Sequence, residues 1–357
     1  MDISKQQNEK YYYISVLNVL SAIAVVVLHA NGSFWNYRND YTWAINNLIE
    51  CVFYFAVPIF FMLTGATLLD YTDKYDTKTF FKKRLSKTVI PFLFWSFFAL
   101  FIKVLHNPKQ FLKNEIAIDK VFNGIFNTEY LHVFWFFIPL FCVYLSIPLF
   151  ANLNKEKKIN LLWYLACVAF LFNILIPFGI KVANAVFGWG IQWKFEISVL
   201  SGYLFYTIIG YLLHKCSISR KIRIAIYSTA LIGLIIHFVG TYLLSQKHEE
   251  INDFFKGYTN LPCVLCSVGI FVFVKSFVEK SKNNKLLELV CWIQGYTFEI
   301  YLMHMFVYEP VSYLLKKMHF ANTSLLFVLL MTVILIPTCI IITIILRKIP
   351  LLKKIVP

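Results

Sequence analysis

The stretch YISVLNVLSAIAVVVLHA, residues 13–30, decides the fold class of this chain. It carries no Asp, Glu, Lys or Arg, and a helix of this length nearly crosses the apolar core of a bilayer. The composition of the whole chain agrees, because 59% of its 357 residues are hydrophobic and only 15% are charged. Soluble domains are about a quarter charged. The sequence therefore indicates an integral membrane protein.

Apolar segments of similar length recur along the chain, and backbone groups in lipid must be paired within the segment, so we expect each to be a helix. No linker, repeat or low-complexity tract divides the sequence. We therefore expect an all-α, polytopic membrane protein with about ten transmembrane helices, forming a single domain over residues 1–357. The predicted spans are 13–30, 44–69, 88–106, 131–151, 160–178, 198–214, 222–244, 258–275, 291–315 and 323–346.

The formal net charge of +15 invites a nucleic-acid partner, but the distribution of the basic residues argues against one. With the N-terminus inside, 23 of the 34 Lys and Arg residues fall in the predicted cytoplasmic segments and 10 in the outer ones. This asymmetry is the positive-inside rule. It predicts that both termini are cytoplasmic and that membrane lipids surround the chain. The first apolar run has no small-residue cleavage site, so we expect it to be retained.

The eight cysteines lie almost all within predicted spans. Cys263 and Cys266 form a C-x-x-C pair, but no second Cys or His pair completes a zinc site. We expect a structural role for this pair and no metal.

Ionisable residues at membrane depth are costly unless they have a partner or a function. His29 ends the first span on the outer side, and histidine suits proton transfer near neutral pH. Glu50 lies at a similar depth in the second span, so it is a candidate to orient the imidazole. The alternatives are an interfacial His29 bonded to a loop carbonyl, and a Glu50 that faces water or pairs with Arg38.

The densest basic cluster lies on the predicted cytoplasmic side, in KTFFKKRLSKTVIPFLFW. On a continuous helix, Lys83, Arg84 and Lys87 share one face at the mouth of the third span. Guanidinium and ammonium groups suit phosphates, so this face is a candidate site for a phosphate-rich ligand. Topogenic charge that also attracts anionic lipid is the alternative.

Two later spans carry further polar candidates. His132 and Trp135 open the fourth span on the outer side, where they are candidates to contact a substrate. Tyr301 and His304 lie three residues apart in the ninth span and share a helical face. Either residue of the second pair is also explained as a packed, hydrogen-bonded polar side chain.

These motifs, in their order, resemble the acyltransferase-3 family of bacterial membrane acyltransferases over nearly the whole chain. The likeness rests on a histidine that ends span one, on VPIFFMLTGATLL in span two, and on KKRLSKTVIPFLFW, HVFWFFIPLFCVYLSIP and TFEIYLMH further along. The second of these motifs looks most like the subgroup that O-acetylates surface polysaccharides. The resemblance implies a bacterial cytoplasmic membrane protein that moves an acetyl group from acetyl-CoA, on the cytoplasmic side, to a hydroxyl of a surface or lipid-linked glycan.

The resemblance also assigns roles. His29 matches the essential histidine of the family's first span, and Arg84 matches the first arginine of its R-x-x-R motif. Lys87 stands at the second arginine, which keeps the charge but loses the planar fork. Asn18 stands where the family commonly has Arg or Lys, about 16 Å from His29 along the helix.

These assignments combine into one mechanism. Lys83, Arg84, Lys87 and Asn18 would bind acyl-CoA, His29 with Glu50 would take the proton of the acceptor hydroxyl, and Tyr301 or His304 would stabilise the oxyanion. An acyl intermediate on His29 is the variant of this mechanism. A transporter or flippase that moves a glycan or small solute without covalent chemistry is the alternative function.

Overall fold

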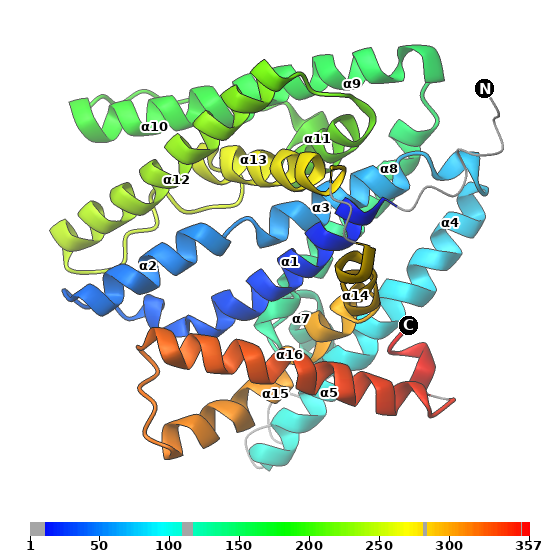
Figure 1. Ribbon diagram of the computed structural model, residues 1–357, viewed down its shortest axis with the longest axis vertical. Helices are drawn as coiled ribbons and strands as arrows, with labels where there is room; N and C mark the ends of the chain where they lie inside the picture. Colours follow the sequence, from blue (N-terminus) through cyan, green and yellow to red (C-terminus); the bar gives the residue numbers. More distant parts are fainter. Residues whose placement is uncertain (1–10, 109–116, 281–283, 351) are drawn as a thin grey trace.

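The computed structural model describes residues 11–108, 117–280, 284–350 and 352–357. Within these ranges every regular element is a helix, and the long helices lie side by side in one bundle (Figure 1), which confirms an all-α polytopic membrane protein. The α-helices are α1 Tyr12–Ala30, α2 Tyr41–Phe53, α3 Ala56–Leu68, α4 Thr77–Arg84, α5 Ile90–His106, α7 Ile118–Phe126, α8 Phe137–Ala151, α9 Lys155–Ala169, α10 Ile176–Phe187, α11 Tyr203–Lys215, α12 Arg220–His248, α13 Leu261–Val278, α14 Asn284–Gln294, α15 Thr297–Lys317 and α16 Leu325–Arg347.

Among the described residues, eight helical segments are long and apolar enough to cross a membrane, against the ten spans expected from the sequence. The other two predicted spans, 198–214 and 291–315, are also largely helical, but for different reasons they do not form long, uniformly apolar helices. The α11 helix has only 13 residues because its predicted span is interrupted at Gly202, where φ is +58°. The α15 helix is long enough, but it carries Glu299, Glu309 and two C-terminal lysines.

The α1 helix occupies the centre of the bundle, where it contacts α2, α3, α13, α14, α15 and α16. The α3 and α11 helices make the closest approach, which depends on two glycines. A Cβ atom added at Gly65 would lie 1.7 Å from the Thr207 carbonyl oxygen, and one added at Gly210 would lie 2.1 Å from that of Met62. Small residues allow such backbone contact between helices in a membrane.

Two π-helical segments interrupt long helices, and each one leads into a proline. Leu85–Val89 precedes Pro91 and Phe170–Leu175 precedes Pro177. Proline has no N–H to offer the carbonyl four residues earlier, and it crowds that carbonyl. A wider turn relieves this conflict, and such turns are frequent at functional sites.

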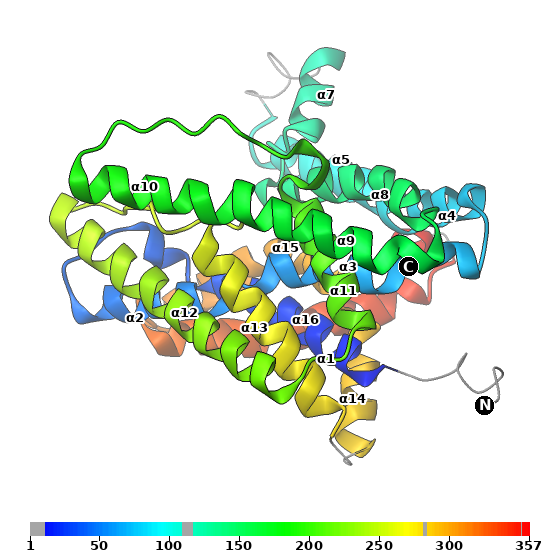
Figure 2. The same ribbon diagram turned by 90° about the horizontal axis from the view of Figure 1, so that it is seen from above.

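The start of α1 and the last described residues lie at the same end of the bundle as α4, at the right of Figure 1. The start of α2 and the end of α12 lie at the opposite end. Figure 2 shows α9 and α10 as an outer layer, from which the following segment arches away. The loop from Glu249 to Asn260 instead returns to the bundle, since Lys256 within it is buried.

Candidate active site

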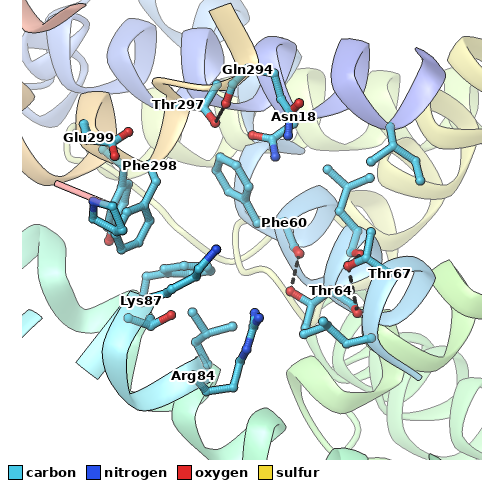
Figure 3. A pocket seen from close by; sticks show the side chains of 18 of the residues that line it. Asn18, Phe60, Thr64, Thr67, Arg84, Lys87, Gln294, Thr297, Phe298 and Glu299 are labelled. Carbon is cyan, nitrogen blue, oxygen red and sulfur yellow. Dashed lines mark hydrogen bonds between the residues drawn. The ribbon is translucent and has the colours of Figure 1, made fainter. Parts of the chain in front are cut away.

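A cavity of about 490 Å³ lies between α1, α3, the α4–α5 region, α8 and the start of α15. Four residues singled out from the sequence line it: Asn18, Arg84, Lys87 and Tyr301. Figure 3 shows Arg84 and Lys87 on one side of this cavity, with Asn18, Gln294 and Thr297 across from them. The structure therefore brings Arg84 and Lys87 of the basic cluster together with the first part of the ninth predicted span, which includes Tyr301.

The basic wall depends on the π-helical turn after α4. Arg84 is the last residue of α4 and Lys87 lies in Leu85–Val89. The guanidinium carbon of Arg84 lies 5.6 Å from the ring centre of Tyr144, and its Nε is buried without a hydrogen-bond partner among the described residues. Buried donors are normally paired, so this one is available to a bound acceptor.

Lys83 is separated from this wall. Its ammonium lies 3.8 Å above the ring of Tyr75, and Lys83 does not line the cavity. The single basic face expected for residues 83, 84 and 87 is wrong in this respect. Lys83 and Arg84 are consecutive residues of α4 and point about 100° apart, and the π-helical turn changes the register of Lys87 relative to both.

The opposite wall carries polar groups from α1 and α15. The Oδ1 atom of Asn18 is buried and has no hydrogen-bond partner in the described part of the chain. Glu299 is nearly inaccessible and receives a hydrogen bond from Arg347 at 2.7 Å, which ties α15 to α16 beside the cavity. The carboxylate of Glu299 is thus neutralised by a partner that the sequence did not reveal.

Tyr301 lines the cavity, and its ring is close to the first of two neighbouring histidines. The ring centres of Tyr301 and His304 lie 6.0 Å apart, and those of His304 and His29 lie 5.0 Å apart. His304 is fully buried and His29 is half-buried. Tyr301, His304 and His29 are therefore successive ring neighbours between the cavity and the end of α1.

The hydrogen bonds of His304 fix its tautomer. Its Nδ1 lies 2.8 Å from the carbonyl oxygen of Tyr301 and 3.1 Å from that of Ile300. Two acceptors can be satisfied only if Nδ1 carries the proton, so in the neutral ring Nε2 bears the lone pair. That Nε2 atom is buried and has no partner among the described residues.

Tyr301 and His304, the two residues expected to stabilise an oxyanion, thus donate their hydrogen bonds to backbone carbonyls. The hydroxyl of Tyr301 donates to the carbonyl oxygen of Val133, and the Nδ1–H of His304 donates to its own helix. In this arrangement the free atom of His304 is a proton acceptor. The unpaired Nε2 atom of His304 therefore belongs to a ring whose centre lies 5.0 Å from that of His29.

Glu50 lies beyond His29, but its carboxylate contacts other groups. Within the described residues its hydrogen-bond partners are the ammonium of Lys256 at 2.9 Å and the amide of Asn31 at 3.4 Å. The expected contact with the imidazole of His29 is not formed. The alternative pairing with Arg38 is also wrong, because Arg38 pairs with Asp40.

Lys256 is the residue that sequence reasoning missed. The sequence places it in an outer loop between two predicted spans, and nothing in the neighbouring residues indicates that it is buried. The signal that was present is Glu50, because a carboxylate at membrane depth requires a cation.

His132 and Trp135 share the 3₁₀ turn His132–Phe136, whose Val133 carbonyl accepts the Tyr301 hydrogen bond. His132 is exposed and lies within electrostatic range of His29. Trp135 is half-buried and stacks on Tyr258, with ring centres 5.5 Å apart. Neither residue lines the cavity, and both are linked to Tyr301 through this turn.

In the described part of the chain, no three His, Cys, Asp or Glu residues are grouped so that they could hold a metal ion. Cys263 is buried and Cys266 is half-buried, and their thiols contact backbone carbonyls.

The fold and the site define a polytopic membrane protein with a basic cavity lined by Tyr301, whose ring neighbours the first of two adjacent histidines. A family model described as an acyltransferase domain matches residues 11–344. The chain therefore belongs to the acyltransferase-3 family of membrane acyltransferases.

The chain is also similar to a protein of Enterococcus faecalis named amino-acid racemase. The two are 21% identical over 330 residues, which are 90% of this chain and 44% of that protein. The chain thus spans less than half the length of this relative. The comparison with solved structures finds no match.

Proposed function

We propose that this protein is an acyl-CoA-dependent O-acyltransferase that moves an acetyl group from cytoplasmic acetyl-CoA to a hydroxyl of a surface or lipid-linked glycan. The observation that carries the proposal is the cavity, which has Arg84 and Lys87 on one wall and reaches Tyr301 beside the histidine pair. The family supplies acyl transfer. The acetyl group, the glycan and the bacterial cytoplasmic membrane rest on the resemblance of the sequence motifs to the polysaccharide O-acetylating subgroup.

The donor would enter from the basic wall. The phosphates of acetyl-CoA would bind the free Nε of Arg84 and the ammonium of Lys87, because charge-assisted hydrogen bonds to phosphate are strong. Asn18 offers a neutral acceptor across the cavity where a cation is common in the family. The remaining lining is largely apolar, with Phe60, Phe136 and Phe298 among its side chains, and suits the thin pantetheine arm.

The thioester would then lie beside Tyr301, within reach of the histidine pair. His29 takes the proton from the acceptor hydroxyl while the oxygen attacks the thioester carbonyl carbon. A C–O bond forms, the C–S bond breaks, and the proton passes from His29 to the departing sulfur, which gives the ester and free CoA. The lone pair on His304 Nε2 would accept a hydrogen bond from the His29 ring and so hold its orientation, since the two ring centres lie 5.0 Å apart.

The acceptor would approach from the opposite end of the bundle. His132 and Trp135 would meet it there, and an indole face suits the apolar face of a sugar ring. Tyr301 contributes indirectly, because its hydroxyl holds the turn that carries both residues.

The direct test is release of CoA from acetyl-CoA by purified protein in lipid nanodiscs. We expect steady release by the native chain and at least a 100-fold lower rate for His29→Ala, since general base catalysis contributes about 10²- to 10⁴-fold. Binding of acetyl-CoA by the native protein without release would contradict the proposal and favour a carrier without covalent chemistry.

A further inference from the structure

We propose that Lys256 is a positioning residue for His29, acting with Glu50 through the end of α1. The inference rests on the proposed acyltransferase function. It concerns a residue that no motif of the sequence includes, in the loop between α12 and α13. Three sets of contacts carry it.

The first is a buried ion pair. The ammonium of Lys256 lies 2.9 Å from Glu50 Oε1, and the two side chains are 3% and 5% exposed. A pair buried this deeply is weak evidence for stability, since the loss of hydration offsets much of the attraction. The alternative is that the ion pair fixes the positions of nearby residues, and its contacts show which residues these are.

The second set links this pair to the residues that follow His29. The Asn31 amide donates to Glu50 Oε2 at 3.4 Å and to the Asn46 carbonyl at 2.8 Å. Asn31 lies two residues after His29, and it is the C-cap of α1. Its Oδ1 is buried and unpartnered among the described residues, so one acceptor of this network remains open beside the site.

The third set is aromatic. The ammonium of Lys256 lies 4.5 Å from the ring centre of Phe34, 5.2 Å from Trp35 and 4.4 Å from Tyr54. Phe34 and Trp35 belong to the short 3₁₀ helix Gly32–Trp35 that follows α1. Tyr54 is the C-cap of α2. The cation therefore attracts rings from the segment after α1 and from the end of α2, and so holds the two together.

The same loop also reaches the acceptor side. Tyr258, two residues after Lys256, stacks on Tyr54 at 4.5 Å and on Trp135 at 5.5 Å. Lys256 and Tyr258 thus connect the segment that follows α1, the C-terminal end of α2 and the ring of Trp135. If Lys256 fixes the direction of the His29 ring, its loss will lower the rate of chemistry without weakening donor binding.

The test replaces both charges at once, with Glu50→Leu and Lys256→Met in one chain. The double change leaves no buried charge unpaired, so we expect it to fold where either single variant is unstable. We expect kcat for CoA release to fall about 10- to 100-fold, the effect of a slightly misplaced catalytic group, with KM for acetyl-CoA unchanged. Lys256→Arg, which keeps the cation, should retain most of the native kcat.

Lys181→Met is the matched control. Lys181 donates to the Phe254 carbonyl at 2.5 Å and lies 4.2 Å from the Phe254 ring centre. It therefore contacts the loop that contains Lys256, but at a different residue and, among the described residues, without a contact to the end of α1. We expect its kcat to be native. A folded double variant with native kcat would overturn the inference, and so would an equal loss of kcat in Lys181→Met.

A second readout does not depend on turnover. The rate at which diethyl pyrocarbonate modifies His29, measured by peptide mass spectrometry against the exposed His248, should change at least threefold in the double variant. An unchanged rate would overturn the positioning role. Absence of CoA release by the native protein, with a changed rate at His29, would contradict the proposed function alone.

Discussion

At the scale of single residues, Arg84 and Lys83 are neighbours in the chain with different surroundings. Arg84 lines the cavity and leaves its Nε free, whereas the ammonium of Lys83 lies over the ring of Tyr75. Composition cannot separate the two, since both are basic residues of one cluster. The two are consecutive residues of α4, so their side chains point about 100° apart, and we expect only Arg84 to contribute to donor binding.

Arg84→Ala should raise KM for acetyl-CoA by about 10- to 100-fold, because a hydrogen bond to a charged group contributes about 1.5–3 kcal/mol. Lys83→Ala should leave KM within about twofold of native. Initial rates of CoA release over a range of acetyl-CoA concentrations measure both. Equal effects of the two substitutions would show that the cluster acts only as diffuse charge.

The sequence led to Glu50 and His304 but not to their partners. A carboxylate at membrane depth calls for a cation, but which of the chain's 34 basic residues supplies it depends on how a distant loop folds back. The tautomer of His304 likewise depends on two backbone carbonyls of its own helix turn. The candidate residues were therefore predictable from the sequence, whereas their hydrogen-bond partners depend on the three-dimensional fold.

At the scale of helices, hydropathy predicted where the spans lie but not how closely they pack. The α3–α11 contact depends on Gly65 and Gly210, and each faces a backbone carbonyl of the other helix. Proline positions gave a partial signal, since both π-helical segments lead into one. The π-helical turn before Pro91 changes the register between Lys83 and Lys87.

Gly65→Ala should destabilise the protein, because its Cβ atom would lie 1.7 Å from the Thr207 carbonyl oxygen and the helices would have to separate. Overpacking of this kind costs about 1–3 kcal/mol. We expect a lower melting temperature in detergent, measured by tryptophan fluorescence.

Gly179→Ala is the control for that measurement. It also places a methyl group on a helix, but nothing lies within 4 Å of the added Cβ atom. Since alanine favours helix over glycine, its melting temperature should equal or exceed the native value. A Gly65→Ala protein that melts with the control would show that α3 and α11 do not pack as described.

At the scale of the whole molecule, the start of α1 and the last described residues lie at the end that carries Arg84. The excess of Lys and Arg predicts that this end is cytoplasmic. A green fluorescent protein fused after Pro357 should therefore fluoresce, and alkaline phosphatase fused at Lys194 should be active. The opposite pattern would invert the orientation and place the basic cavity on the wrong side for cytoplasmic acetyl-CoA.

The most direct test of the central claim uses sealed inside-out membrane vesicles from cells that make the acceptor glycan. Acetyl-CoA carrying a radiolabelled acetyl group is added outside the vesicles, at the cytoplasmic face. We expect alkali-labile label on glycan enclosed in the vesicles when the native chain is present, and none with His29→Ala. Equal labelling with His29→Ala, at equal protein levels, would contradict transfer of the acetyl group through this bundle.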